Sequence, residues 1–342
     1  MKALMKLKKG YGEVELREIP EPVPGPEEVK VEIKYCGICG TDMKIFHGEH
    51  AYYKAPSILG HEMIGTVTEI GKNVTGVEIG DNVVATESSV TKAKSLYGHS
   101  MDPWVEQSYR GFTGGGGFAK YGVYDDKAIL KVPQSIDLKS GALLEPLACA
   151  VHAIIEKAPI HCNDIVVVSG PGPMGLLTAQ LAKNEGGFVI ILGRSADQNK
   201  LELALDLGID MALNIEKQDT IDTILDISNE AGADLVFECV GVASSVSECM
   251  RLVRRYGYFI QVGSSAKLME VDFAQIMYKE LTVMGSFGRE RIDWERSVRL
   301  LETGKVKTKP LISHILPLSA WHEAFMLFEE GKGVKILLCP DE

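Results

Sequence analysis

Apolar and polar residues along the first 150 positions follow the short, interrupted pattern of β-strands. Runs rich in Val, Ile and Tyr at 29–35, 64–70 and 81–85 are separated by Gly and Pro. Such runs are typical of partly buried strands bounded by turns. The pattern therefore predicts an irregular, mostly β domain over residues 1–150.

From about residue 160 the pattern changes to alternating strands and helices. An apolar run at 164–169 leads into a glycine turn and an amphipathic stretch that ends near Asn184. Strand-like segments at 188–192, 211–214, 235–239 and 258–262 then alternate with helical segments at 200–207, 221–230 and 246–253. This alternation predicts an α/β domain with a doubly wound parallel sheet.

The C-terminal part returns to segments punctuated by proline. After an apolar run at 281–285, the segments 309–312 and 315–318 precede one predicted helix near 320–330. We expect most of this tail to complete the first domain. The predicted division is therefore 1–150 with 287–342, and 151–286.

Composition narrows the class of protein. The chain has 342 residues and a formal net charge of -11, which argues against nucleic acid or an anionic membrane as a partner. No apolar run is long enough to span a bilayer, and the N-terminus lacks the apolar stretch of a signal peptide. Seven scattered cysteines, an odd number, favour reduced thiols and a cytoplasmic location over a disulfide framework.

The glycine turn carries a dinucleotide-binding pattern. Gly170, Gly172 and Gly175 have the G-x-G-x-x-G spacing, with Pro173 and Met174 between the last two glycines. Alone this spacing is weak, but here a strand precedes it and a helix follows it. That context allows a tight turn, a close approach of the backbone to a pyrophosphate, and a helix N-terminus facing the phosphate.

The end of the second strand of this domain distinguishes NAD from NADP. In an NAD site, an acidic residue about 20 residues after the glycines binds the ribose hydroxyls. This sequence instead has Gly193, Arg194 and Ser195, with Lys200 one helical turn later. A guanidinium and a hydroxyl suit a 2′-phosphate, so the sequence predicts NADP in preference to NAD. The alternative is that Arg194 is a solvated residue and the protein is indifferent to the phosphate.

Four side chains of the first domain have the chemistry of a catalytic zinc site. Cys39, His61 and Glu62 can supply a thiolate, an imidazole and a carboxylate, and such a site keeps one position for water or substrate. Glu145 is either the fourth ligand or a neighbour that replaces a ligand as the metal shifts. Singly, His61 has a structural explanation as a core histidine, and Glu145 as an acid at a helix start before Pro146.

The other cysteines are interpreted as packing residues. Cys36 has the C-x-x-C spacing with Cys39, but the chain contains no second C-x-x-C pair. Cys36 is therefore predicted to be a small buried side chain. The core is also the favoured location for the five cysteines in or beside apolar runs, namely Cys149, Cys162, Cys239, Cys249 and Cys339.

These motifs together resemble one enzyme family. In order they are Gly37-Ile38-Cys39-Gly40-Thr41-Asp42, Gly60-His61-Glu62, Glu145-Pro146-Leu147, the turn from Gly170 to Gly175, and Glu238-Cys239-Val240-Gly241. The chain resembles, essentially end to end, the zinc-dependent medium-chain alcohol dehydrogenases, and within them the sorbitol (L-iditol) and polyol branch. The resemblance implies a GroES-like catalytic domain, a Rossmann cofactor domain with the active site between them, and a dimer or tetramer.

The resemblance also implies roles for individual residues. Cys39, His61, Glu62 and Glu145 match the catalytic metal site, and Thr41 matches the hydroxyl that bonds the substrate oxygen and begins the proton relay. Two segments match those that line the nicotinamide. The matching residues are Val262, Gly263 and Ser264 in the first segment and Ser286, Phe287 and Arg289 in the second, and Val240 is a further predicted cofactor-binding residue.

The sequence departs from the family pattern at two places. Lys44 stands where many relatives carry the relay histidine, and His47 is close in sequence but not at the matching position. The lobe between about Thr86 and Gly111 contains none of the four cysteines that hold a structural zinc in many relatives. We therefore expect one catalytic zinc and no structural zinc. The lobe is expected either to be held by packing through aromatic residues such as Tyr97, Trp104, Tyr109 and Phe112, or to be mobile.

The resulting hypothesis is reversible oxidation of a secondary hydroxyl of a sugar or polyol. Zinc would lower the pKa of the alcohol, and the cofactor domain would orient the nicotinamide for hydride transfer. Threonine or a simple secondary alcohol is an alternative substrate, and threonine would require a cation such as Lys44 or Arg289. A catalytically silent dinucleotide-binding protein is a weaker alternative, because the intact ligand set would then have no function.

Overall fold

The computed structural model describes residues 1–50, 53–86, 115–265 and 267–341. The chain forms two compact units, unit 1 with Met1–Glu145 and Leu311–Glu342, and unit 2 with Pro146–Pro310. Residues 146–150 and 287–310, expected in the first domain, belong to unit 2. Side-chain pairing explains this: Asp293 on α9 (Arg291–Glu302) bonds His152 on α3 (Leu144–Ile155), and the Gln180 amide bonds the Lys307 carbonyl.

The described residues of unit 1 form two β-sheets. The larger runs in the order β15-β16-β3-β5-β6-β8, with β7 also paired to β3, and the smaller runs β2-β1-β4. These strands are β1 (Lys2–Lys6), β2 (Val14–Glu18), β3 (Glu28–Gly37), β4 (Ser57–Ile58), β5 (Glu62–Ile70), β6 (Asn82–Ala85), β7 (Tyr121–Asp125), β8 (Ile129–Val132), β15 (Ile312–Pro317) and β16 (Lys335–Cys339). The sheet predicted from the strand-like runs at 29–35, 64–70 and 81–85 is therefore present.

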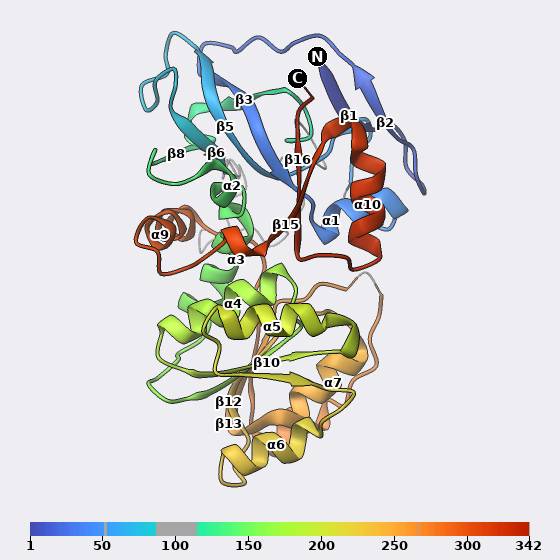
Figure 1. The fold of residues 1–342 in the computed structure, drawn as a ribbon, viewed down its shortest axis with the longest axis vertical. Coiled ribbons are helices and arrows are strands. Elements are labelled where there is room, and N and C mark those ends of the chain that lie inside the picture. The colour runs from blue at the N-terminus through green and yellow to red at the C-terminus, as the bar shows by residue number, and fades with distance from the viewer. Residues whose placement is uncertain (51–52, 87–114, 266, 342) are drawn as a thin grey trace, which may run out of the picture. The chain divides into compact units, whose positions relative to one another are not determined.

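Short helices complete unit 1. They are α1 (Gly40–His47), α2 (Leu138–Gly141), α10 (Trp321–Glu329) and the 3-10 turns η1 (Asp126–Ala128) and η4 (Leu318–Ala320), while η3 (Lys309–Leu311) crosses the unit boundary. Phe46 of α1 and Phe325 of α10 pack edge to face with ring centroids 5.6 Å apart. Figure 1 shows these two helices side by side, so the C-terminal tail closes the core next to the first helix.

Unit 2 is built on a six-stranded parallel sheet. Its order, β11-β10-β9-β12-β13-β14, is that of a Rossmann domain, with the change of direction between β9 and β12. The strands are β9 (Ile165–Ser169), β10 (Phe188–Gly193), β11 (Met211–Asn214), β12 (Ala233–Glu238), β13 (Val253–Gln261) and β14 (Thr282–Gly285). Their buried Val, Ile, Leu and Phe side chains form the centre of the core, as expected of a sheet covered on both faces.

Helices cover both faces of this sheet. In Figure 1, α4 (Pro173–Asn184) and α5 (Gln198–Asp206) lie on one face, and α6 (Thr220–Ile227) and α7 (Ala243–Leu252) on the other. The 3-10 turn η2 (Ser195–Asp197) joins β10 to α5, and α8 (Ala274–Lys279) precedes β14. The doubly wound parallel sheet predicted from the sequence is confirmed.

Some predictions from the sequence were incomplete. Helices α8 and α9 were not predicted, because their apolar residues are mixed with polar and charged ones, and strand β16 was not predicted either. The predicted packing of Tyr97, Trp104, Tyr109 and Phe112 lies outside the described residues. Across the described ranges, none of the helices combines the length and apolar character needed to cross a membrane.

Candidate metal and cofactor sites

Three of the four predicted metal ligands come together in unit 1. The donor atoms of Cys39, His61 and Glu62 all lie within 4.8 Å of one another. Among the described residues, these three side chains form the group of possible ligands that lie close enough together to hold a metal ion. A thiolate, an imidazole and a carboxylate are ligands that zinc accepts in a tetrahedral site. The donor set therefore fits a catalytic zinc ion.

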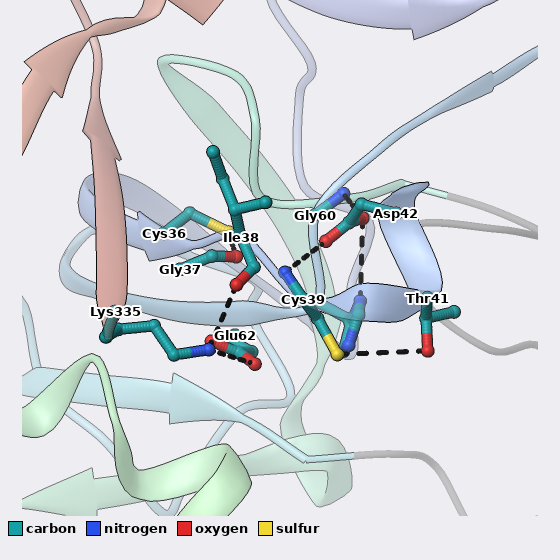
Figure 2. A network of polar contacts seen from close by, with 10 residues as sticks. Cys36, Gly37, Ile38, Cys39, Thr41, Asp42, Gly60, Glu62 and Lys335 are labelled. Atoms are coloured by element: carbon teal, nitrogen blue, oxygen red, sulfur yellow. Dashed lines mark hydrogen bonds and ion pairs between the residues drawn. The ribbon is translucent and has the colours of Figure 1, made fainter. Parts of the chain in front are cut away.

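Cys39 and His61 are positioned through Asp42, a residue to which the sequence assigned no role. Cys39 is the N-cap of α1, and its backbone N–H donates to the Asp42 carboxylate at 2.9 Å. The other oxygen of Asp42 accepts from the Gly60 N–H at 3.3 Å and lies 3.7 Å from His61 Nδ1. One fully buried carboxylate thus fixes both segments that carry ligands (Figure 2).

The charge on His61 is favoured by its surroundings. Its side chain is only 10% exposed, and burial alone would disfavour the charged imidazole. The Asp42 carboxylate and the Cys39 sulfur outweigh burial and raise the pKa of His61 well above its usual value. The same negative surroundings favour a bound cation at this place.

Glu62 has a buried partner that the sequence did not reveal. Both of its carboxylate oxygens accept from Lys335 Nζ, at 2.8 and 2.6 Å, and the same ammonium donates to the Ile38 carbonyl at 3.0 Å (Figure 2). The two side chains are 1% and 3% exposed. A Cβ on Gly37 would overlap the Glu62 carboxylate, so only glycine leaves room for the pair.

Opposing effects act on the two members of this pair. Burial raises the pKa of Glu62, and Lys335 opposes that rise. Burial alone would lower the pKa of Lys335, but the charges of Glu62 and Cys39 outweigh it and raise that pKa. The ammonium is therefore kept charged beside the metal ligands, where it limits the excess of negative charge.

Glu145 lies outside the group of three. It is buried at the start of α3 and close enough to raise the pKa of Glu62 by repulsion. Its carboxylate also helps to raise the pKa of Lys335. Glu145 therefore lies near Glu62 but is not grouped with the three donors, and its role as fourth ligand or as neighbouring acid stays a prediction.

The Thr41 hydroxyl lies next to the metal-site thiol. Its Oγ1 is 3.8 Å from Cys39 Sγ, on the first turn of α1 (Figure 2). Lys44 follows on the same helix, and burial lowers its pKa against the opposing effect of Cys39. His47, in contrast, pairs with Glu329 of α10, which removes it from the metal cluster.

The glycine turn of unit 2 has the form that a dinucleotide requires. Gly170 has a φ of +94°, and a Cβ on Gly175 would overlap the Gly170 carbonyl oxygen. A Cβ on Gly172 would meet nothing within 4 Å, so the backbone there is open to a ligand. Helix α4 begins directly after Gly172 with Pro173 at its first position. Open backbone at a helix N-terminus fits a pyrophosphate.

Two further loops are tied to this turn by the buried carboxylate of Glu238. It accepts from the backbone N–H groups of Val240 and Gly241 at 2.9 Å and from Gln261 Nε2. The backbone N–H groups of Val262 and Gly263 donate to the backbone carbonyl oxygen of Glu238. Val240 packs against Gly170, and Gly241 against the Ser264 backbone. The structure thus brings Gly170, Val240, Gly263 and Ser264 together.

Of the predicted phosphate-binding residues, Arg194 and Ser195 directly follow β10 and Lys200 lies on α5, each beside a carboxylate. Lys200 Nζ is 3.0 Å and Arg194 Nε is 3.7 Å from Asp197, and the Ser195 N–H donates to Glu216 at 3.0 Å. A Cβ on Gly193 would lie 2.9 Å from Pro171 of the glycine turn. These residues therefore border the dinucleotide site, although acids surround them.

The last predicted cofactor residues follow β14. The Ser286 N–H donates to the Gln261 carbonyl at 2.9 Å, which joins this segment to β13. Phe287 is 55% exposed. Arg289 donates to Cys149 Sγ at 3.5 Å, and its guanidinium carbon lies 5.4 Å from the centre of the Trp294 ring. Arg289 is therefore held against α3 and α9.

Comparisons with known proteins agree with this arrangement. Residues 25–134 match the alcohol dehydrogenase GroES-like domain, and residues 173–303 match the zinc-binding dehydrogenase model. A sorbitol dehydrogenase of Halalkalibacterium halodurans is 38% identical over 99% of each chain. The chain belongs to the zinc-dependent medium-chain alcohol dehydrogenases. It is therefore an NAD(P)-dependent oxidoreductase with a GroES-like and a Rossmann domain.

Other members of this family differ in the substrates that they are named for. A D-arabitol-phosphate dehydrogenase of Enterococcus avium is 32% identical over 99% of this chain and 97% of its own. An L-threonine 3-dehydrogenase of Pyrococcus horikoshii is 34% identical over 98% of each chain. A zinc-binding dehydrogenase of Sinorhizobium meliloti, solved with NADP, superposes with a TM-score of 0.91, 30% identity and 99% coverage of both chains.

The cysteine interpretations were partly right. Cys36 and Cys249 are buried, as predicted, and burial raises the pKa of both thiols. Cys162 is exposed, so its assignment to the core was wrong. It lies in the turn before β9, whose apolar run begins only at Ile165. Cys149, Cys239 and Cys339 are of intermediate exposure.

Proposed function

We propose that the protein reversibly oxidises a secondary hydroxyl of a sugar or polyol, with NADP as its preferred cofactor. The grouping of Cys39, His61 and Glu62 within 4.8 Å, beside the Thr41 hydroxyl, carries the proposal. The 38% identity to a sorbitol dehydrogenase and the 32% identity to a D-arabitol-phosphate dehydrogenase support the polyol class.

The residues of unit 1 have separate tasks in this mechanism. Cys39, His61 and Glu62 would hold a zinc ion, with Glu145 as a neighbouring carboxylate. When bound, zinc supplies Lewis-acid chemistry that lowers the pKa of an alcohol. The Thr41 hydroxyl would accept the proton of the substrate hydroxyl while it releases its own proton to solvent, so that the threonine stays neutral. Lys335 and Asp42 hold Glu62 and His61 in place, so that the ligand geometry is set before substrate arrives.

The residues of unit 2 bind and orient the cofactor. The turn from Gly170 to Gly175, with Pro173 and Met174, receives the pyrophosphate at the N-terminus of α4. Val240, Val262, Gly263, Ser264, Ser286, Phe287 and Arg289 are the proposed nicotinamide side of the site. Arg194, Ser195 and Lys200 are the proposed partners of the 2′-phosphate, and the S. meliloti relative solved with NADP supports this preference.

A panel of alcohols tests the substrate class. Purified protein is assayed with sorbitol, arabitol, their phosphates, L-threonine and 2,3-butanediol, each with NADP and with NAD. We expect the highest kcat/KM with a polyol or its phosphate and NADP. L-threonine is the second candidate because of the 34% identical threonine dehydrogenase, and a clear preference for it would overturn the polyol assignment.

We further propose that the protein is a homo-oligomer, a dimer or tetramer. Strand β14 is the last strand of the unit 2 sheet, and Val283 on it is 40% exposed. Phe273, Met277 and Tyr278 on or beside α8 are 71%, 63% and 72% exposed. An exposed apolar edge strand favours pairing with a second copy. Light scattering should give at least twice the chain mass, and Val283→Lys should lower it.

The absence of disulfides among the described residues supports the proposal of a reducing compartment such as the cytoplasm. None of the seven cysteines, all of which are described, forms a disulfide, and burial raises the pKa of the Cys249 thiol to about 12. Intracellular proteins commonly keep their cysteines in this reduced form.

A further inference from the structure

We propose that Glu216 limits the preference for NADP by holding the backbone N–H of Ser195, a donor that a 2′-phosphate would use. The inference rests on the proposed NADP function and concerns the same site. The sequence has no acid at the end of β10, but the structure brings one there from the end of β11. Because β10 and β11 are adjacent and parallel, with Gly193 opposite Asn214, residues after the two strands meet.

The geometry around Ser195 carries this inference. Its backbone N–H donates to Glu216 Oε2 at 3.0 Å, and its hydroxyl accepts from Asn214 Nδ2 at 3.2 Å. The Glu216 backbone N–H donates to Asn214 Oδ1 at 3.0 Å, which fixes the acid next to the serine. A carboxylate oxygen therefore already accepts from the backbone N–H that a phosphate oxygen would need.

Asp197, the other acid at this place, has a structural role. Its carboxylate accepts from the Arg194 N–H at 3.2 Å and from Lys200 at 3.0 Å, and its side chain is 14% exposed. Replacing it would disturb the turn that presents both cations. Glu216 is exposed, and the backbone of its segment is also held by the hydrogen bond from the Ile215 N–H to the Gly193 carbonyl. Its carboxylate can therefore be changed without removing that support.

The electrostatic consequence differs between the two cofactors. A 2′-phosphate carries close to two negative charges at neutral pH, so it competes with Glu216 for Ser195 and is repelled by it. The ribose hydroxyls of NAD are uncharged and can donate to a carboxylate. Glu216 therefore opposes NADP binding without opposing NAD binding, and the cations at Arg194 and Lys200 must overcome it.

The experiment compares Glu216→Gln with wild-type protein. Calorimetric titrations with 2′,5′-ADP and 5′-AMP measure the adenosine site alone, and kcat/KM with NADP and NAD measures the complete reaction. We expect affinity for 2′,5′-ADP and kcat/KM with NADP to rise about three- to tenfold, with no gain for 5′-AMP or NAD. The gain should shrink in high salt.

Two controls separate this inference from the function on which it rests. Glu185→Gln removes the same charge at the other end of α4 and should change neither ligand's affinity. Arg194→Ala should weaken 2′,5′-ADP but not 5′-AMP. If the wild type prefers 5′-AMP and NAD and Arg194→Ala changes nothing, the proposed NADP preference is wrong. If Arg194→Ala behaves as expected but Glu216→Gln leaves 2′,5′-ADP binding unchanged, or raises 5′-AMP binding equally, the role of Glu216 is wrong.

Discussion

The metal site in unit 1 and the dinucleotide site in unit 2 are built from different parts of the chain. The metal site consists of buried charged side chains from β5, α1, the segments before them and β16, and Lys335 lies 273 residues from Glu62 in sequence. The dinucleotide turn consists of the backbone of six consecutive residues, 170–175, with exposed charges nearby. The buried carboxylate of Glu62 is paired with a lysine from a distant part of the chain, whereas the open backbone of the turn depends only on glycines within the same six residues.

Removing the buried ammonium should have the largest effect on stability. Lys335→Met leaves the Glu62 carboxylate buried beside Glu145 without its cation, which costs about 3–5 kcal/mol of unfolding free energy. Urea unfolding of chelator-treated and zinc-loaded protein measures this cost. Glu62→Gln with Lys335→Met should recover part of the loss, because no unpaired charge then remains.

Lys131→Met is the matched control, since Lys131 pairs with Asp81 at 2.8 Å with its side chain 52% exposed. Its unfolding midpoint should stay close to that of the wild type. Equal losses for the two lysine variants would contradict the difference drawn between buried and exposed charge.

Two glycines of one turn should respond differently to the same change. Gly175→Ala places a methyl group against the Gly170 carbonyl oxygen and should cost about 1–3 kcal/mol of unfolding free energy. Gly172→Ala adds its methyl group to open space, so its melting temperature should hold while NADP affinity falls about tenfold. Thermal unfolding with and without NADP separates the two effects. A Gly172→Ala protein that binds NADP normally would refute the pyrophosphate assignment.

Replacing Asp42 tests how strongly zinc affinity depends on the residue that positions Cys39 and His61. Asp42→Asn keeps the shape but removes the charge that faces His61 and one of the two oxygens that accept from the Cys39 and Gly60 N–H groups. Zinc affinity should fall about 10–100-fold in competition with a chromophoric chelator. Asp81→Asn, on the exposed pair of the same unit, should leave zinc affinity unchanged. An unaltered affinity in Asp42→Asn would show that the ligands are held without it.

The smallest expected effect is a difference in how ionic strength changes cofactor binding at unit 2 and the stability of the buried pair in unit 1. Arg194 has a side chain that is 66% exposed, so raising ionic strength should weaken NADP binding severalfold while 5′-AMP binding changes little. The unfolding free energy contributed by the buried Glu62–Lys335 pair, measured as the difference from Lys335→Met, should change much less. If ionic strength changed NADP affinity and the stability contribution of the Glu62–Lys335 pair equally, the proposed difference between exposed and buried charge would be contradicted.

The same contrast explains what the sequence could and could not predict. The alternation of strands and helices in unit 2 follows from local patterns, and this prediction is confirmed. The glycine turn also follows from a local pattern and lies between a strand and a helix as predicted, while its binding of a dinucleotide stays a prediction. Cys39, His61 and Glu62 could be selected because their residue types match zinc chemistry. Lys335, in a short strand that was not predicted, gave no local signal, and Glu216 was missed because the acid was sought on β10 rather than on its neighbour.

Asp42 has one contact that the sequence could have predicted and one that it could not. Its place three residues after Cys39, at the first turn of α1, is a recognisable capping position, so its bond to the Cys39 backbone could have been predicted. Its second contact with the His61 segment could not, because it depends on how β5 approaches α1. The placement of 287–310 in unit 2 likewise depends on the His152–Asp293 pair, whose members are 141 residues apart.

Zinc content, measured together with activity, tests the central assignment most directly. Elemental analysis of the purified protein should give about one zinc per chain. His61→Ala should lose both the zinc and the alcohol oxidation while it keeps the circular dichroism spectrum and NADP binding of the wild type. A well-folded wild-type protein that contains no zinc and takes up none, or a His61→Ala protein that keeps full activity, would contradict the account.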